Sequence, residues 1–215
     1  MQSPDRAMSS SRTQYRFAHA WLPTGWQRDV VVAVEVDGTI AEVILDHQRQ
    51  LMDDATHVKG AAIPGMPNVH GHAFQRAMTG LAEHAHRTGR DKSQQDSFWT
   101  WRETMYEHAS RMSPGMLEAI AAQLYVEMIK AGYTTACEFH YLHNRPDGRP
   151  YDDPLAMHRA LWTAADRAGI GLTLLPTLYQ TADFGGVAPT LRQRQFVLET
   201  HDYLDLVRAL QVAKP

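Results

Sequence analysis

From residue 61 to residue 210 the sequence alternates between short strand patterns and longer helix patterns, and this order limits the folds open to the chain. Strand patterns are expected at 61–69, 133–141 and 171–176, and helix patterns at 114–131, 154–168 and 192–210. Strands that alternate with helices favour βαβ units around a parallel sheet. The continuously apolar stretch 171–176 is typical of a strand buried on both faces of such a sheet.

Three strand–helix units are visible, and the chain stops at Lys214-Pro215, where a fourth strand is expected. A closed (β/α)₈ barrel takes about 250 residues. The chain is therefore either a small open α/β protein or the first part of something longer.

The residues before this alternation have a different pattern. Residues 1–13 are polar and rich in serine, and we expect a disordered tail. Residues 14–60 are predicted to form a small β-rich segment, since Asp37-Gly38 separates two β-branched stretches and is a strong hairpin signal. We expect this segment to be antiparallel, with residues 61–215 forming the main body.

Composition excludes several classes of partner. The net charge of -3 gives no reason to expect binding to nucleic acid or to an anionic membrane. No apolar stretch approaches the ~18 residues of a membrane-spanning helix. Cys137 is the single cysteine, which rules out an internal disulfide and suits a reducing compartment, so we expect a cytoplasmic protein.

The pair His70-Gly71-His72 is the first candidate for chemistry. In a strand, residues i and i+2 point to the same face, so both imidazoles can reach one point. Neutral imidazole is the commonest protein metal ligand. The alternative is that two histidines near a turn are ordinary surface residues.

Further candidates follow the predicted strands, because ligands gather at the carboxyl ends of parallel strands. Gln75 follows the first strand, and Glu138, His140 and Tyr141 close the second. Glu138 and His140 share a face by alternation, so each can be the other's partner, and His140 can equally be a satisfied core histidine. Arg102 follows two tryptophans; its guanidinium suits a carboxylate clamp, although stacking on indole explains it as well.

Three segments together resemble the amidohydrolase superfamily and, within it, the formimidoylglutamate deiminases. The first segment, residues 64–76, is similar to the first-strand motif in which His-x-His binds the catalytic metal. The others are Asp96-Ser97-Phe98-Trp99-Thr100-Trp101-Arg102-Glu103 and Glu138-Phe139-His140-Tyr141-Leu142-His143. The resemblance runs from about Tyr15 to about Leu210 and covers the first half of that family's length.

The resemblance implies a metal-dependent (β/α)₈ TIM barrel preceded by a small β-sandwich element, with only the first three βα units in this chain. It implies hydrolysis of N-formimidoyl-L-glutamate to N-formyl-L-glutamate and ammonia, in histidine degradation, with one zinc ion activating the water. His70 and His72 would bind the zinc, and Gln75, Arg102 and Tyr141 would contact the substrate. Arg102 is the expected partner of a glutamate carboxylate.

The remaining metal ligands and the general acid and base lie, in the family, on later strands that this sequence lacks. No catalytic residue is therefore assigned here, and we expect these 215 residues alone to be inactive. An unpaired edge strand favours aggregation or association with another copy or a missing second half; a homodimer is expected of the complete enzyme.

Two other hypotheses stay open. One is a different amidohydrolase that deaminates a nucleobase or a guanidine-type substrate, against which Arg102 argues, since a neutral base needs no cation. The other is a non-catalytic remnant, or a half that works only with a partner.

Overall fold

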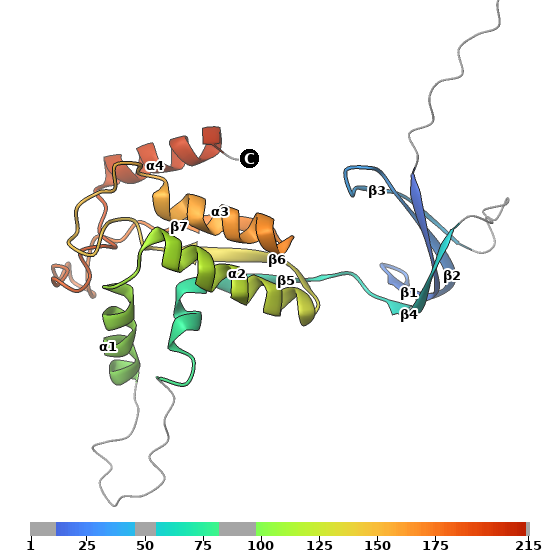
Figure 1. Cartoon of the computed structure of the whole chain (residues 1–215), viewed down its shortest axis with the longest axis horizontal. Helices are drawn as coiled ribbons and strands as arrows, with labels where there is room; N and C mark the ends of the chain where they lie inside the picture. The colour runs from blue at the N-terminus through green and yellow to red at the C-terminus, as the bar shows by residue number, and fades with distance from the viewer. Residues whose placement is uncertain (1–11, 46–54, 82–97, 214–215) are drawn as a thin grey trace, which may run out of the picture. The chain divides into compact units, whose positions relative to one another are not determined.

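The computed structural model describes residues 12–45, 55–81 and 98–213 (Figure 1). The chain divides into two compact units, Met1–Pro64 and Gly65–Pro215, which we describe separately. The expected tail lies largely outside the described residues.

The first unit is a four-stranded sheet with the order β3-β2-β1-β4. Its strands are β1 (Thr13–Leu22), β2 (Gly25–Val34), β3 (Ile40–Ile44) and β4 (Thr56–Ala62). The hairpin expected at Asp37-Gly38 is confirmed, since β2 and β3 pair antiparallel around it. The expectation of a purely antiparallel sheet is wrong, because β4 pairs with β1 rather than with its sequence neighbour β3, and this pairing is parallel.

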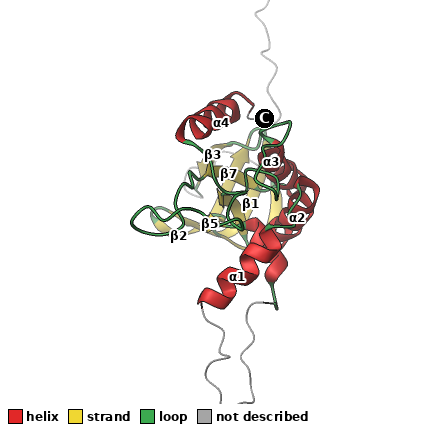
Figure 2. Ribbon diagram, turned by 90° about the vertical axis from the view of Figure 1, so that its left-hand side faces the viewer, coloured by secondary structure: helices red, strands yellow, loops and turns green. Residues whose placement is uncertain are grey.

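The second unit contains a parallel sheet with the order β5-β6-β7. Two helices, α2 and α3, lie side by side on one side of this sheet (Figures 1 and 2). The strands are β5 (Met66–Gly71), β6 (Tyr133–His140) and β7 (Gly171–Pro176). The helices are η2 (Ala73–Met78, a 3₁₀ helix), α1 (Phe98–Ala109), α2 (Pro114–Lys130), α3 (Ala156–Ala168) and α4 (Thr200–Ala213).

Local sequence explains where the two covering helices begin and end. The Ser113 side chain accepts a hydrogen bond from the backbone N–H of Met116 and caps α2, whose first residue is proline. Helix α3 ends at Gly169, whose φ of 77° lies in the left-handed region that favours glycine.

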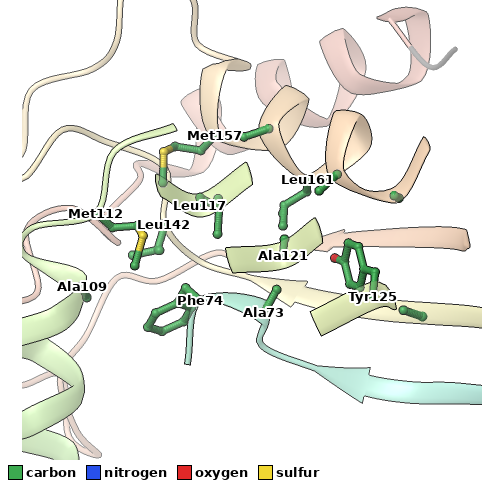
Figure 3. Close-up of a cluster of buried hydrophobic side chains, with 14 of the residues drawn as sticks. Ala73, Phe74, Ala109, Met112, Leu117, Ala121, Tyr125, Leu142, Met157 and Leu161 are labelled. Atoms are coloured by element: carbon green, nitrogen blue, oxygen red, sulfur yellow. The ribbon is translucent and has the colours of Figure 1, made fainter. Parts of the chain in front are cut away.

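The core lies between the sheet and these helices (Figure 3). Tyr125 of α2, Leu161 of α3 and Phe74 of η2 are each at most 1% exposed. Phe74 lies two residues after His72, so the core holds the His70–His72 stretch against β6. The labelled members are Ala73, Phe74, Ala109, Met112, Leu117, Ala121, Tyr125, Leu142, Met157 and Leu161.

Two expectations about the last part of the chain are wrong. The final helix begins at Thr200 and not at residue 192, because residues 192–196 form turns that bury Gln193 and Phe196, and Val197 then bridges to Tyr179. Strand β7 is not buried on both faces: its exposure alternates, and Leu175 is 39% exposed. β7 is an edge strand of this sheet, and one of its faces packs on the core while the other faces outward.

None of the described helices is long and apolar enough to cross a membrane.

Candidate functional site

The imidazoles of His70 and His72 meet at the carboxyl end of β5. His70 lies in the strand, and His72 follows it as the residue before η2. Their Nε2 atoms are 3.1 Å apart. Two nitrogen ligands bound at 2.0–2.1 Å to one tetrahedral zinc ion lie about 3.3 Å apart. The pair therefore has the spacing of two ligands of one metal ion.

The orientation of His72 is set from β6. Its Nδ1 lies 2.8 Å from the carbonyl oxygen of Phe139, so Nδ1–H donates and Nε2 presents its lone pair toward His70. Burial lowers the pKa of His72, with a smaller contribution from the neighbouring His70. A carbonyl that holds one ring nitrogen of a metal-binding histidine is a common supporting contact. The Phe139 ring also packs on both imidazoles.

Gln75 and Tyr141 come together beside this pair. The Gln75 amide donates to the Tyr141 hydroxyl at 3.0 Å. The Tyr141 ring lies edge-on to His72, with the ring centroids 5.3 Å apart. Burial raises the pKa of Tyr141 above its usual value, so its hydroxyl stays protonated and can donate to a ligand. Two of the three expected substrate-binding residues thus adjoin the histidine pair.

Arg102, the third, lies on α1 in a separate polar network. Its Nε donates to the Tyr106 hydroxyl at 2.6 Å, and a terminal nitrogen donates to the Ala182 carbonyl at 3.3 Å. The guanidinium also lies over the Tyr106 ring, 5.4 Å from its centroid. Its hydrogen bond with Tyr106 raises the pKa of Arg102, which stays charged.

Gln193 joins this network and was not expected from the sequence. Its amide nitrogen donates to the hydroxyls of Tyr106 and Tyr179, at 2.8 and 2.7 Å, and the residue is 1% exposed. Phe196, three residues on, packs its ring against Tyr141 at 5.1 Å. These residues link the Arg102 network to the Tyr141 side of the site. The sequence pattern predicts a helix over residues 192–210, and that pattern gives no sign that Gln193 and Phe196 contact the site.

Glu138 and His140 share the buried face of β6, as alternation predicts, but they are not partners. Glu138 accepts hydrogen bonds from the backbone N–H of Ala73, at 2.6 Å, and from the Tyr125 hydroxyl, at 3.3 Å. It therefore ties β6 to the residue after His72. Burial raises the pKa of Glu138 to about 7, and the two hydrogen bonds oppose that rise.

Comparison with known proteins identifies relatives of this chain in sequence and in fold. No family model matches the chain. The chain is 50% identical over 192 residues to the formimidoylglutamate deiminase of Pseudomonas aeruginosa, a match covering 89% of this chain and 40% of that protein. The chain thus spans two fifths of the length of the curated relative that it matches.

Solved structures agree on the fold. An amidohydrolase from Brucella melitensis is 37% identical, with a TM-score of 0.81 over 94% of this chain and 44% of that one. Atrazine chlorohydrolase from Arthrobacter aurescens, solved with zinc, is 16% identical, with a TM-score of 0.66 over 94% of this chain and 43% of that one. The described part of the chain has the architecture of part of an amidohydrolase barrel.

Proposed function

Since the chain carries part of the amidohydrolase fold and is similar in sequence to a formimidoylglutamate deiminase, we propose that it forms the metal- and substrate-binding first part of such an enzyme. The reaction would be hydrolysis of N-formimidoyl-L-glutamate to N-formyl-L-glutamate and ammonia, a step of histidine degradation in the cytoplasm. Residues 61–215 would supply the first three βα units of the barrel, and residues 14–60 the small β-rich element before it.

The histidine pair carries the proposal. Two Nε2 atoms 3.1 Å apart, one oriented by the Phe139 carbonyl, fit two ligands of one zinc ion. When bound, zinc supplies Lewis-acid activation of the attacking water. A solved structure with the same fold is complexed with zinc, which supports that choice of metal.

The substrate would lie against Gln75, Tyr141 and Arg102. The Tyr141 hydroxyl already accepts from Gln75, so its own hydrogen can be donated to a substrate oxygen or nitrogen. Arg102 is the charged member and would pair with a glutamate carboxylate in two parallel hydrogen bonds. Tyr106 would hold the guanidinium in position, and Gln193 would in turn hold the Tyr106 hydroxyl.

A catalytic zinc usually has three protein ligands and a water molecule. The matched motif supplies two, His70 and His72, so we propose that these 215 residues alone do not turn over substrate. The remaining ligands and the proton-transfer groups would come from the part of the barrel beyond this match. The assembled enzyme would be a homodimer.

Ammonia release tests the proposal. The chain joined to the complementary part of the Pseudomonas aeruginosa relative should release ammonia from formimidoylglutamate and leave guanine unchanged. The chain alone should release none from either. Turnover by the isolated chain with stoichiometric zinc would contradict the incomplete site, and turnover of guanine would contradict the substrate class.

A matched pair of variants tests the role of Arg102 in the joined protein. Arg102→Lys keeps the charge but loses the planar fork, so KM for formimidoylglutamate should rise at least about tenfold. Arg111→Lys alters an exposed arginine on the turn after α1 that pairs with Glu107, and should leave KM unchanged. Equal KM values for the two variants would rule out a carboxylate clamp at Arg102.

A further inference from the structure

Three buried histidines gather beneath the helix layer, apart from the His70–His72 pair. His140 ends β6, His143 follows it in the next loop, and His158 lies on α3. They are 1%, 5% and 0% exposed. One ring nitrogen of each lies within 4.8 Å of those of the other two. We call this group the three-histidine cluster.

The cluster lies on the opposite face of β6 from the site described above. Successive residues of a strand point to opposite faces. Phe139 packs on the rings of His70 and His72, whereas His140 belongs to the buried face that the helices cover. The cluster is therefore a separate place in the fold, and its interpretation does not depend on the deiminase proposal.

Four ring nitrogens of the cluster have no hydrogen-bond partner among the described residues. The His143 Nε2–H donates to the Thr177 carbonyl at 2.9 Å, which leaves Nδ1 with a lone pair. His140 Nε2 and both ring nitrogens of His158 also lack partners. Buried polar atoms are normally satisfied, so four such nitrogens in one place call for a ligand.

The three rings lie close together, with the centroids of His140 and His143 5.8 Å apart. The centroid of the His158 ring lies 4.9 Å from that of His140 and 5.5 Å from that of His143. Three imidazole nitrogens bound to one tetrahedral ion lie about 3.3 Å apart. Small ring rotations would bring the three histidine nitrogens to this spacing.

The cluster borders a cavity at His143. A cavity of about 500 Å³ has His143 and Asn144 in its wall, together with the carboxylate residues Glu199, Asp202 and Asp205. Carboxylates in such a wall attract a divalent cation toward His143.

We propose that His140 Nε2, His143 Nδ1 and one ring nitrogen of His158 form a second metal site, selective for a divalent ion that prefers imidazole, Zn²⁺ first. Three imidazoles without a thiolate or carboxylate favour zinc over magnesium or calcium, which prefer oxygen. The bound ion would tie α3 to the end of β6. Its role would be structural, since the cluster is enclosed by the core.

The test uses the full chain in which His70 and His72 are replaced, so that this pair no longer binds metal. The His70→Ala/His72→Ala double variant, stripped of metal and then loaded with Zn²⁺, should keep about one equivalent after gel filtration. Co²⁺ in place of Zn²⁺ should give the intense visible absorption of a tetrahedral site. Zn²⁺ should also raise the melting temperature of this variant.

His158→Phe in the same background keeps a buried ring but removes both nitrogens, and should abolish metal retention and the cobalt absorption. The matched control, His201→Phe, removes an exposed imidazole on α4 and should retain the metal. Circular dichroism of the helices checks that each variant is folded.

Two results would overturn the proposal: a folded double variant that retains no metal, or a folded His158→Phe variant that still retains it. If His158→Phe does not fold, X-ray absorption of the zinc-loaded double variant decides. Three imidazole ligands would support the site, and fewer than three would refute it.

Discussion

Replacing Glu138 by glutamine should remove a large part of the pH dependence of stability in the unit Gly65–Pro215. Burial raises the pKa of Glu138 from its ordinary 4.5 to about 7. The folded state therefore binds this proton more tightly than the unfolded state. A raised folded pKa contributes stability that is fully present below about pH 4.5 and is lost as the pH rises through about 7.

The size of the effect follows from the pKa difference. A difference of about 2.5 pKa units corresponds to about 3 kcal/mol, because each unit is worth 1.36 kcal/mol. About 2.5 kcal/mol of this stability is lost as the pH rises from about 5 to about 8. Glutamine is neutral at both values and can still accept from the Ala73 N–H, so the variant should not lose this stability.

Other groups on the same side of the sheet act in the opposite direction. Burial lowers the pKa of His143 to about 4 and that of His158 to about 3. A lowered histidine pKa contributes stability that is lost as the pH falls below about 6.5. These contributions are common to both proteins, so the difference between wild type and Glu138→Gln isolates Glu138.

Urea unfolding followed by far-ultraviolet circular dichroism measures this difference, because all the described helices belong to this unit. A chelator keeps both proteins free of metal. Relative to wild type, Glu138→Gln should gain about 2.5 kcal/mol between about pH 5 and about pH 8. Parallel pH profiles for the two proteins would refute the reasoning.

Glu127→Gln is the matched control. Its carboxylate pairs with Arg76, and the hydrogen bonds from that guanidinium lower the pKa of Glu127 to about 2. A lowered carboxyl pKa contributes stability that is already complete above about pH 4.5 and is lost only in stronger acid. The variant should therefore follow the wild-type pH profile between about pH 5 and about pH 8.

Three further substitutions test packing and capping, each by urea unfolding. Ser113→Ala removes the cap of α2 and should cost about 1 kcal/mol, so an unchanged midpoint would contradict the cap. Leu161→Ala empties a fully buried position and should cost about 2–5 kcal/mol. Gly65→Ala places a Cβ in steric conflict with the Thr134 side chain and should cost about 1–3 kcal/mol, whereas Gly115→Ala, with open space around it, should not destabilise.

The local elements were largely determined by the sequence. Ser113-Pro114 and Gly169 mark helix ends that the structure places within two residues of the expected positions, and residues 171–176 form the expected strand. Such signals work because capping, turn formation and side-chain periodicity depend on neighbours a few residues away. The meeting of His70 and His72 was predictable for the same reason, since both lie within three residues.

Only the tertiary structure decided which residues that are far apart in the sequence come into contact. Gln193 lies 87 residues from Tyr106, yet its amide bonds the Tyr106 hydroxyl, and no local pattern records that contact. Alternation along β6 predicts the correct face for Glu138, but His140 is not its partner. Its hydrogen-bond donors are the Ala73 N–H and the Tyr125 hydroxyl, which come from other elements.

The three-histidine cluster is the clearest case of this division. His140 and His143 are close in sequence, but His158 meets them only because α3 packs with that residue toward the end of β6. Sequence spacing fixes which residues share one element, since dihedral angles repeat along it. Which elements face one another depends on how their apolar faces pack, and that is a property of the whole fold.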